Sequence, residues 1–479
     1  MIIEHAGYLP GVDADLVAWQ AKLYGPEGDQ ISVLLPVLLE RQVVQLIGHV
    51  REQARLKLKS RPLGQIIDAI DLTISRLLDR QDPYRRRMDH LLPIITGYDR
   101  EMVRLGLTSY LKTFRKPQLQ RFLAEDFTNP TILDSFQPLP KGGLGRAFGP
   151  KILTHVWAGN VPGLPLWSLV AGLLVKAGNI GKVPTAEPMF ASWFSQLFAE
   201  VAPELADCLA VVWWQGGDEV SETAVLEESD LVLGYGQNES LAAIQSRLPV
   251  TKRFLAFGHK VSIAMVSAEA LNASKVSATA RLVAYDVARY DQQGCYAPHM
   301  VFVEHGGSVL PKRFAQYLAY ELAVFEEKFP LRPLSLAEAS GIVSWRNMEE
   351  MIPGGQVFFA DTGSWAVSYQ TEESFLPSCL NRTIRVIGID ALTKVPAILA
   401  PFSDLLQTAG IAAPPEELVT LANSLGEVGV TRIAAIGDMT SPEAGWHHDG
   451  RFNLLDLVKI TEIDGRAEGA ADQLASYDD

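Results

Sequence analysis

One of the three cysteines of the chain, Cys295, lies in a loop whose composition suits a nucleophile. Asp291, two glutamines and a glycine precede it, and His299 follows closely. A polar loop that contains glycine exposes a thiol and lets backbone N–H groups point at whatever bonds to the sulfur. A free cysteine more often only packs, and we expect Cys208 and Cys379 to do so. Cys295 is therefore the candidate nucleophile.

A second polar residue, Asn160, stands in a turn that reads Gly-Asn-Val-Pro, between an expected strand and the helix-like run after it. Side chains and free amide donors project together at such a turn. The Asn160 amide there would donate to a developing oxyanion, an interaction that contributes about 3 kcal/mol to lowering a barrier. The alternative is that Asn160 only caps the helix.

The elements that position these residues alternate between short apolar runs and helical patterns. Runs at Ile152 to Trp157, Leu209 to Trp214 and Leu231 to Leu233 are typical of strands, with helical patterns between them. This order predicts parallel βαβ units with right-handed crossovers. A second set of strands places Cys295 in the turn before Met300 to Glu304. The predicted fold class is α/β.

Changes of pattern along the chain divide it into four expected regions. Residues 1–135 carry long helical patterns and are predicted to form a helical N-terminal segment. A Gly- and Pro-rich stretch then opens residues 136–260, the expected nucleotide-binding domain. Residues 261–445 are expected to form the catalytic domain that carries the nucleophilic cysteine, and residues 446–479 a C-terminal segment.

Charge and hydropathy exclude several classes of protein. A net charge of −14 argues against a nucleic-acid binder, whose affinity rests on neutralising phosphates. The basic run Arg80 to Arg87 is expected to be a solvated helix end, or else to meet an anion such as a phosphopantetheine carrier or the nucleotide of coenzyme A. The most apolar stretch, Val161 to Val175, is too short and too broken by proline and glycine to span a membrane.

The cysteines and the amino terminus indicate a cytoplasmic protein. The three cysteines lack the spacing of a disulfide or zinc framework, and no secretory signal is visible. Adjacent ligands such as His447 and His448 rarely converge on one ion, so no metal is expected. These two residues, together with His259 and His299, are open candidates for moving a proton, and the sequence does not choose among them.

Residues 152–188 resemble the aldehyde dehydrogenase superfamily. In that family a strand ends in an Asn-containing turn, a helix follows, and a Lys-Pro-Ser-Glu-like strand end binds the nucleotide. The resemblance gives Asn160 the oxyanion-hole position and makes Lys182 the nucleotide-binding lysine. It also places the nucleophile in a Gly-Gln-Gly-Cys-like loop downstream, which the run DQQGC supplies at Cys295.

Within that superfamily the chain is more similar to the LuxC-type acyl-CoA reductases, the fatty-acyl reductases of bacterial bioluminescence. The similarity rests on GNVP at 159–162, DVARYDQQGCYAPHMVFVE at 286–304, and GVTRIAAIGDM followed by GWHHDG near the carboxyl end. It implies an aldehyde dehydrogenase-like fold with a Rossmann-type nucleotide-binding lobe and an α/β catalytic lobe. It also implies NADPH-dependent reduction of an acyl-CoA or acyl-carrier thioester to the aldehyde, through an S-acyl intermediate on Cys295.

One departure from hydrolytic aldehyde dehydrogenases concerns the base that activates water. Where those enzymes carry Glu-Leu-Gly-Gly-Lys, this chain has Ala-Phe-Gly-His-Lys from Ala256 to Lys260. Loss of a general base slows a step by about 10²- to 10⁴-fold. The sequence therefore favours acyl transfer and reduction over oxidation to the free acid.

Four residues are expected to contact the cofactor. The resemblance implies this role for Lys182 and Thr185, and the turn after the third strand adds Gly234 and Gly236, whose lack of side chains allows close approach to a phosphate. The ribose-binding glutamate of the family follows its lysine more closely than Glu187 follows Lys182. This spacing favours NADPH over NADH.

Two other functions would use the same sequence. A CoA-acylating aldehyde dehydrogenase that runs toward acyl-CoA shares every residue named above, with coenzyme A as its substrate. A non-catalytic subunit that binds acyl groups or scaffolds partners is the second, since the luminescence reductase works with an acyl-activating synthetase. Apolar residues such as Trp157, Leu164 and Leu166 suit a tunnel for a fatty or an aryl acyl group. The superfamily resemblance implies a homo-oligomer.

Overall fold

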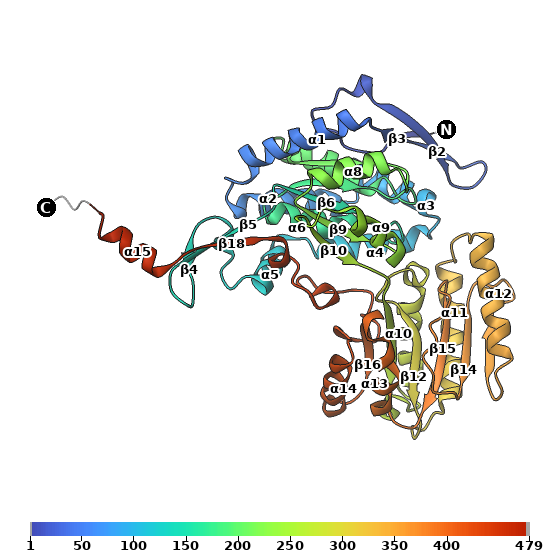
Figure 1. Cartoon of the computed structure of the whole chain (residues 1–479). Helices are drawn as coiled ribbons and strands as arrows, with labels where there is room; N and C mark the ends of the chain where they lie inside the picture. Colours follow the sequence, from blue (N-terminus) through green and yellow to red (C-terminus); the bar gives the residue numbers. More distant parts are fainter. Residues whose placement is uncertain (1, 476–479) are drawn as a thin grey trace.

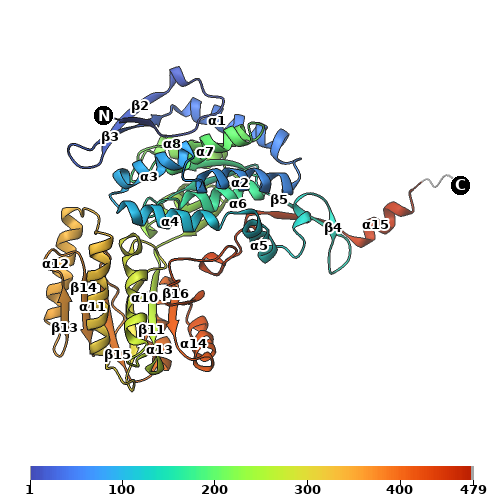
Figure 2. The same cartoon turned by 180° about the vertical axis from the view of Figure 1, so that it is seen from behind.

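The computed structural model describes residues 2–475, which form two open, mostly parallel sheets covered by helices (Figures 1 and 2). The predicted α/β class is confirmed. Among the described residues, no helix combines the length and apolarity that crossing a bilayer requires. The two sheets lie in separate lobes, and a short arm projects from the body of the molecule (Figure 1).

The first 135 residues contain three strands that the helical expectation omitted. The strands β1 (Ile2–His5), β2 (Ala18–Tyr24) and β3 (Ile31–Val37) form a sheet in the order β1-β3-β2. β3 is a nearly continuous buried apolar run, and such a run has no period that separates strand from helix. Helices follow: α1 (Glu40–Gln53), α2 (Leu63–Leu78), α3 (Pro83–Thr96), α4 (Arg100–Lys112) and α5 (Lys116–Asp126).

The basic run Arg80 to Arg87 is in part a solvated helix end, since Arg80 and Arg86 are exposed, and in part a contact between elements. Arg85 is fully buried, and its guanidinium donates to Asp89 at 2.8 Å and to Thr108 of α4 at 2.6 Å. Arg87 pairs with Glu4 and lies over the Trp193 ring. These contacts hold α3 against α4 and β1.

The first large sheet has the strand order β10-β9-β6-β7-β8, with every pair parallel. Its strands are β6 (Ile152–Val156), β7 (Gly178–Lys182), β8 (Leu209–Val212), β9 (Leu231–Tyr235) and β10 (Arg253–Phe257). The helices between them are α6 (Pro165–Leu174), α7 (Phe190–Val201), α8 (Glu219–Glu228) and α9 (Asn238–Arg247). The chain leaves β6 toward β7 on one side and later returns to β9 on the other. The carboxyl end of β6 is therefore a switch point, where open α/β sheets form their ligand crevice.

The second large sheet has the order β13-β14-β15-β12-β11-β16-β17, and only the β13–β14 pair is antiparallel. Its strands are β11 (Val261–Val266), β12 (Pro298–Glu304), β13 (Gln356–Phe359), β14 (Ala366–Gln370), β15 (Thr383–Ile389), β16 (Leu406–Ala412) and β17 (Arg432–Ala435). Its helices are α10 (Val276–Ala288), α11 (Pro311–Lys328), α12 (Leu336–Glu350), α13 (Val395–Leu399) and α14 (Pro415–Glu427). Cys295 lies in the loop between α10 and β12.

The carboxyl-terminal residues return from the second sheet to the first lobe and then enter the arm. The Asp126 carboxylate at the end of α5 accepts hydrogen bonds from the backbone N–H groups of Leu454 at 2.5 Å and Leu455 at 2.9 Å. The arm is a small antiparallel sheet in the order β18-β5-β4, followed by α15 (Figure 2). Its elements are β4 (Gln137–Pro138), β5 (Leu144–Phe148), β18 (Lys459–Ile463) and α15 (Gly465–Asp472).

Candidate active site

A cavity of about 460 Å³ contains both residues to which the sequence assigns the acyl chemistry. Cys295 and Asn160 line it together with aromatic and aliphatic side chains, among them Tyr110, Trp167 and Trp446. These groups come from α4, the β6–α6 turn, α6, the α10–β12 loop and the carboxyl-terminal return. The fold thus joins segments that are far apart in the sequence.

The backbone before Cys295 is held in a strained conformation. Tyr290, Asp291 and Gln292 have φ values of 48°, 51° and 68°, in the left-handed region that side chains disfavour. Each such residue costs of the order of 1–3 kcal/mol, so surrounding contacts must enforce the turn. The Gln292 amide does part of this, since it donates to the carbonyl oxygens of Pro298 at 2.7 Å and Thr383 at 3.0 Å.

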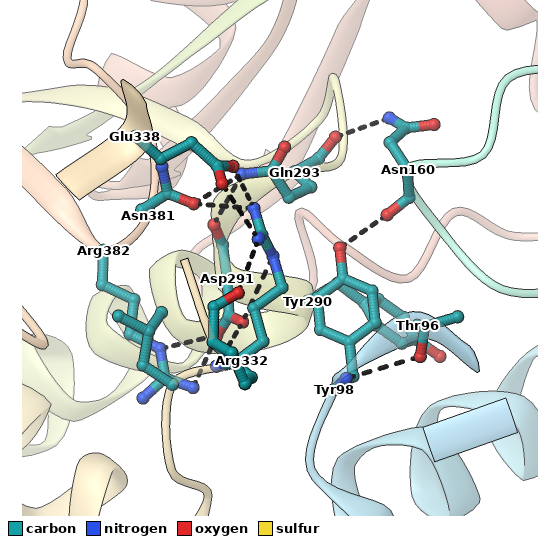
Figure 3. Close-up of polar contacts among 12 residues, drawn as sticks. Thr96, Tyr98, Asn160, Tyr290, Asp291, Gln293, Arg332, Glu338, Asn381 and Arg382 are labelled. Atoms are coloured by element: carbon teal, nitrogen blue, oxygen red, sulfur yellow. Dashed lines mark hydrogen bonds and ion pairs between the residues drawn. The ribbon is translucent and has the colours of Figure 1, made fainter. Parts of the chain in front are cut away.

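A second left-handed turn, at residues 380–382, faces the first and is tied to it by a buried ion pair. Leu380, Asn381 and Arg382 have φ values of 66°, 55° and 62°. The Arg382 guanidinium reaches the Asp291 carboxylate at 2.7 Å, and neither side chain is more than 1% exposed (Figure 3). Arg332 adds a backbone donor to Asp291 at 3.2 Å. The two turns therefore brace each other beside the nucleophile.

Asn160 is oriented by this loop and does not cap the following helix. Its side-chain amide donates to the backbone carbonyl oxygen of Gln293 at 2.7 Å, and the backbone carbonyl oxygen of Asn160 accepts from the Tyr98 hydroxyl at 2.6 Å (Figure 3). A primary amide has two N–H groups, so a second donor remains for a ligand. α6 starts after Leu164 without a side-chain cap, which removes the capping alternative.

The surroundings of Cys295 oppose ionisation of its thiol. Burial raises the pKa of the Cys295 thiol to about 11, Asp449 adds to the rise by repulsion, and the Gln407 amide opposes it. The sequence predicted an exposed thiol, whereas the residue is only partly exposed. The thiol is protonated at neutral pH, so a neighbouring group must take its proton when it attacks.

The GWHHDG motif brings one of the four open histidines into the cavity. His448 lines it, with its ring 4.6 Å from that of Phe257 and 4.9 Å from that of Trp446. His447 instead packs edge-on against Phe452. His259 and His299 contact each other and lie outside the lining of the cavity.

The expected cofactor residues lie along the carboxyl edge of the first sheet. The Lys182 ammonium at the end of β7 is 5.8 Å from the centre of the Trp214 ring, and burial lowers its pKa. Among the described residues it has no carboxylate within ion-pair distance. Thr185 accepts from the Trp213 indole at 3.0 Å, and its carbonyl accepts from the Tyr24 hydroxyl at 2.6 Å. A half-buried cation without an anion fits a polar group of a nucleotide.

The two expected cofactor glycines, Gly234 within β9 and Gly236 directly after it, differ in what surrounds them. A Cβ at Gly236 would meet nothing within 4 Å, so its backbone is open to a ligand. A Cβ at Gly234 would lie 2.7 Å from Leu241 and 3.0 Å from Phe254, so this glycine allows α9 and β10 to pack closely. Gly159 likewise lets the β6 turn approach Pro184 and Ala186.

Two further side chains, Glu187 and Trp157, stabilise the fold around the site. Glu187 accepts from the backbone N–H groups of Met189 and Phe190, both at 2.8 Å, and so satisfies the amino end of α7. Trp157 is buried over Gly181, where a side chain would leave no room for the indole, and donates to Ser168 at 2.8 Å. The expectation that Trp157 faces the acyl tunnel is wrong, while Leu164 does line the cavity.

Four residues that hold the loops of the site in place were not predicted from the sequence. Arg382 lies in the turn before β15, Arg332 in the α11–α12 connection, Gln407 in β16 and Tyr98 between α3 and α4, and no spacing relates them to Cys295. Gln407 left a signal, because it is a polar residue in an otherwise apolar strand pattern.

A sequence profile of the family described as Acyl-CoA reductase (LuxC) matches residues 58–460. Similar curated proteins include long-chain acyl-protein thioester reductases. The one from Aliivibrio fischeri is 24% identical over 412 residues, covering 82% of this chain and 83% of that protein. The second such reductase of Photobacterium leiognathi is 25% identical over 387 residues, covering 79% and 78%.

Solved aldehyde dehydrogenases share the fold. Indole-3-acetaldehyde dehydrogenase of P. syringae, in complex with NAD+, superposes with a TM-score of 0.75 at 13% identity, covering 96% of each chain. The glyceraldehyde-3-phosphate dehydrogenase of Methanocaldococcus jannaschii complexed with NADP has a TM-score of 0.70 at 13% identity, covering 90% of this chain and 95% of that one. The predicted aldehyde dehydrogenase-like architecture is confirmed.

The ion pair beneath the nucleophile loop generates a stability prediction. Asp291→Asn keeps the shape and the tolerance of a left-handed backbone but leaves the buried Arg382 without its counter-charge. Breaking a buried pair in this way costs about 3 kcal/mol, so the urea midpoint of unfolding should fall clearly. Asp390→Asn is the matched control, because Asp390 pairs with Lys394 at an exposed site and should cost below about 1 kcal/mol. Equal midpoints for the two variants would contradict the bracing role.

Proposed function

The chain belongs to the Acyl-CoA reductase (LuxC) family, and from this premise we propose that it reduces an acyl thioester to an aldehyde with NADPH. The acyl group is carried by coenzyme A or by an acyl-carrier protein or acyl-enzyme. One observation carries the proposal: Cys295 and Asn160 open onto the same cavity, which aromatic and aliphatic side chains line. The names of the similar thioester reductases support the reaction type.

The first half of the reaction transfers the acyl group to the enzyme. The Cys295 sulfur attacks the thioester carbonyl, and the carrier thiol leaves. The oxyanion that forms accepts from the free N–H of the Asn160 amide and from the backbone N–H of Cys295. The hydrogen bond from Asn160 to Gln293 fixes the amide before substrate arrives, so little reorganisation is needed.

The second half reduces the S-acyl enzyme. A reduced nicotinamide nucleotide held by Lys182, Thr185 and Gly236 would supply the hydride that the acyl carbon needs. Asn160 again donates to the negatively charged oxygen of the tetrahedral adduct on Cys295. When that adduct collapses, the Cys295 thiolate leaves and the aldehyde is released. β10 ends at Ala256 and Phe257, without the carboxylate that hydrolytic relatives use to activate water. The acyl enzyme therefore persists until hydride transfer.

Lys182, Thr185 and Gly236 are the residues we assign to the cofactor, with Gly234 shaping the same turn through packing. Both NAD+ and NADP occur among the structures of similar fold. Glu187 is engaged at the start of α7, so it does not offer a carboxylate to a ribose or repel a 2′-phosphate. This arrangement supports NADPH.

The arm supports assembly of identical subunits. β18 is an edge strand of the small sheet, and its residues are largely exposed, so its outer backbone groups are free to pair with a second copy. A chain ending at Val458 should elute as a monomer in size exclusion with light scattering, while the full chain elutes as an oligomer. A monomeric full chain would refute this assignment.

The acylation step is tested without any cofactor. Intact mass after incubation with a panel of fatty and aryl acyl-CoA thioesters should show one acyl adduct on the wild type and none on Cys295→Ala. Asn160→Ala should form the adduct about 10²- to 10³-fold more slowly, because one oxyanion donor is lost. Cys379→Ala and Asn272→Ala are matched controls outside the cavity and should react like the wild type. An adduct on Cys295→Ala would disprove the assigned nucleophile.

Cofactor binding is tested separately by isothermal titration. The wild type should bind NADPH more tightly than NADH. Lys182→Met should weaken NADPH binding by about 10- to 100-fold, the worth of one charged hydrogen bond. Lys151→Met, at the exposed start of the same sheet, should bind like the wild type. Tighter NADH binding would overturn the preference for NADPH, and an unchanged Lys182→Met would remove this residue from the site.

A further inference from the structure

The chemistry at Cys295 requires a proton to move. The thiol is protonated at rest, and the carrier thiolate that leaves must gain a proton. Ala256 supplies no carboxylate at the position where hydrolytic aldehyde dehydrogenases keep their base. The acceptor must therefore come from another part of the cavity.

One side chain that lines the cavity has the chemistry of a base near neutral pH. Apart from Cys295 and His448, the titratable groups in the lining are three Lys or Arg side chains, four tyrosines and Glu443. The cations have no lone pair to offer, and burial raises the pKa of all four phenols. Glu443 is 72% exposed and pairs with Arg121 at 2.7 Å. His448 remains.

The ring of His448 is held firmly at the cavity wall. Phe257 and Tyr235 stack on it, with ring centres at 4.6 and 6.2 Å, and Trp446 covers another side at 4.9 Å. Burial lowers the pKa of His448, so the imidazole is neutral and able to accept a proton. The stacking on Phe257 places the imidazole at the carboxyl end of β10, in the lining of the cavity that also contains Cys295.

A carboxylate stands behind the imidazole. Asp449 has a left-handed backbone, with φ of 52°, and this turns its side chain back so that the carboxylate lies 4.0 Å from His448 Nε2. The Gln407 amide fixes that carboxylate by donating to it at 2.6 Å. Gln407 and Thr408 lie in β16, and Ser262 connects this strand to the nucleophile. The Ser262 hydroxyl donates to the Cys295 carbonyl at 2.7 Å and accepts from the Thr408 N–H at 3.2 Å.

We infer that His448 takes the proton of the Cys295 thiol and returns it to the leaving thiol, while the Asp449 carboxylate stabilises the imidazolium. The inference rests on the proposed thioester reduction and adds the proton path to it. As the Cys295 sulfur bonds to the acyl carbon, its S–H proton passes to the imidazole. As the bond from the acyl carbon to the carrier sulfur breaks, the imidazolium protonates that sulfur. After aldehyde release, a proton from solvent passes through His448 to the Cys295 thiolate.

Other charges face these groups and set the pH range. Lys260 and Arg451 lie near the imidazole and disfavour a second positive charge, whereas Asp449 favours it. Arg432 and Tyr296 lie on the side of the thiol. The pair formed by imidazolium and Asp449 is neutral overall, so the thiol proton can move without creating an isolated charge in an apolar cavity.

The test is the rate of alkylation of Cys295 by iodoacetamide between pH 6.5 and 8.5, followed by peptide mass. It needs neither a thioester nor a cofactor. With a neutral imidazole as base, the wild-type rate should change little across this range. His448→Gln should react about 10²-fold more slowly at pH 7.5 and gain about tenfold per pH unit, because only free thiolate then reacts. Asp449→Asn should lie between the two.

His447→Gln is the matched control, since its ring packs on Phe452 outside the cavity, and it should keep the wild-type profile. A wild-type rate that rises tenfold per pH unit would overturn the inference by itself, even if a variant failed to fold. A wild-type profile in His448→Gln would overturn it too. If alkylation depends on His448 but no acyl-CoA forms an adduct, then the proposed substrate fails while the proton path stands.

Discussion

The Asp291 carboxylate and the Arg382 guanidinium meet where neither is more than 1% exposed, and the loop of the nucleophile is built on that contact. Two ions removed from water must compensate each other, because either one alone would cost several kcal/mol. Each belongs to a left-handed turn that its own residues disfavour. The pair therefore offsets backbone strain on both sides, and it fixes where Gln293 presents its carbonyl oxygen to Asn160 (Figure 3). The oxyanion donor and the nucleophile inherit their positions from this one contact.

The acyl chain of the proposed substrate requires an apolar cavity, and such a cavity opposes the charge that a thiolate nucleophile carries. The aromatic walls that exclude water raise the pKa of Cys295 to about 11. A loop rich in cations would lower that pKa but would also bind anions and water where the acyl chain must lie. In the proposed mechanism the resting thiol stays neutral, and a neutral imidazole lines the same cavity. Charge then appears only while the reaction proceeds.

The sequence predicted the α/β class, both sheets and the two central residues of the cavity because each leaves a local mark. Alternating apolar runs mark parallel strands, and Cys295 and Asn160 each stand in a polar turn at a strand end. β1–β3 were missed, since β3 is buried along nearly its whole length and shows no period. Trp157 was misplaced because its orientation depends on the absence of a side chain at Gly181, a neighbour in space and not in sequence. Arg382 and Gln407 could not be assigned, because only the folded sheet brings them to the nucleophile.

The return of the chain after β17 completes the site from outside the second sheet. Asp126 at the end of α5 receives the backbone of Leu454 and Leu455, and the Trp167 indole donates to Asn453 at 3.3 Å. These contacts bind the return to the same helices that wall the cavity. They lie a few residues beyond His448 and Asp449, so the first lobe holds this segment from one side, while Gln407 of the second sheet holds Asp449 from the other. Any shift of one lobe against the other would move His448 relative to Cys295, so the proposed proton transfer depends on the contact between the lobes.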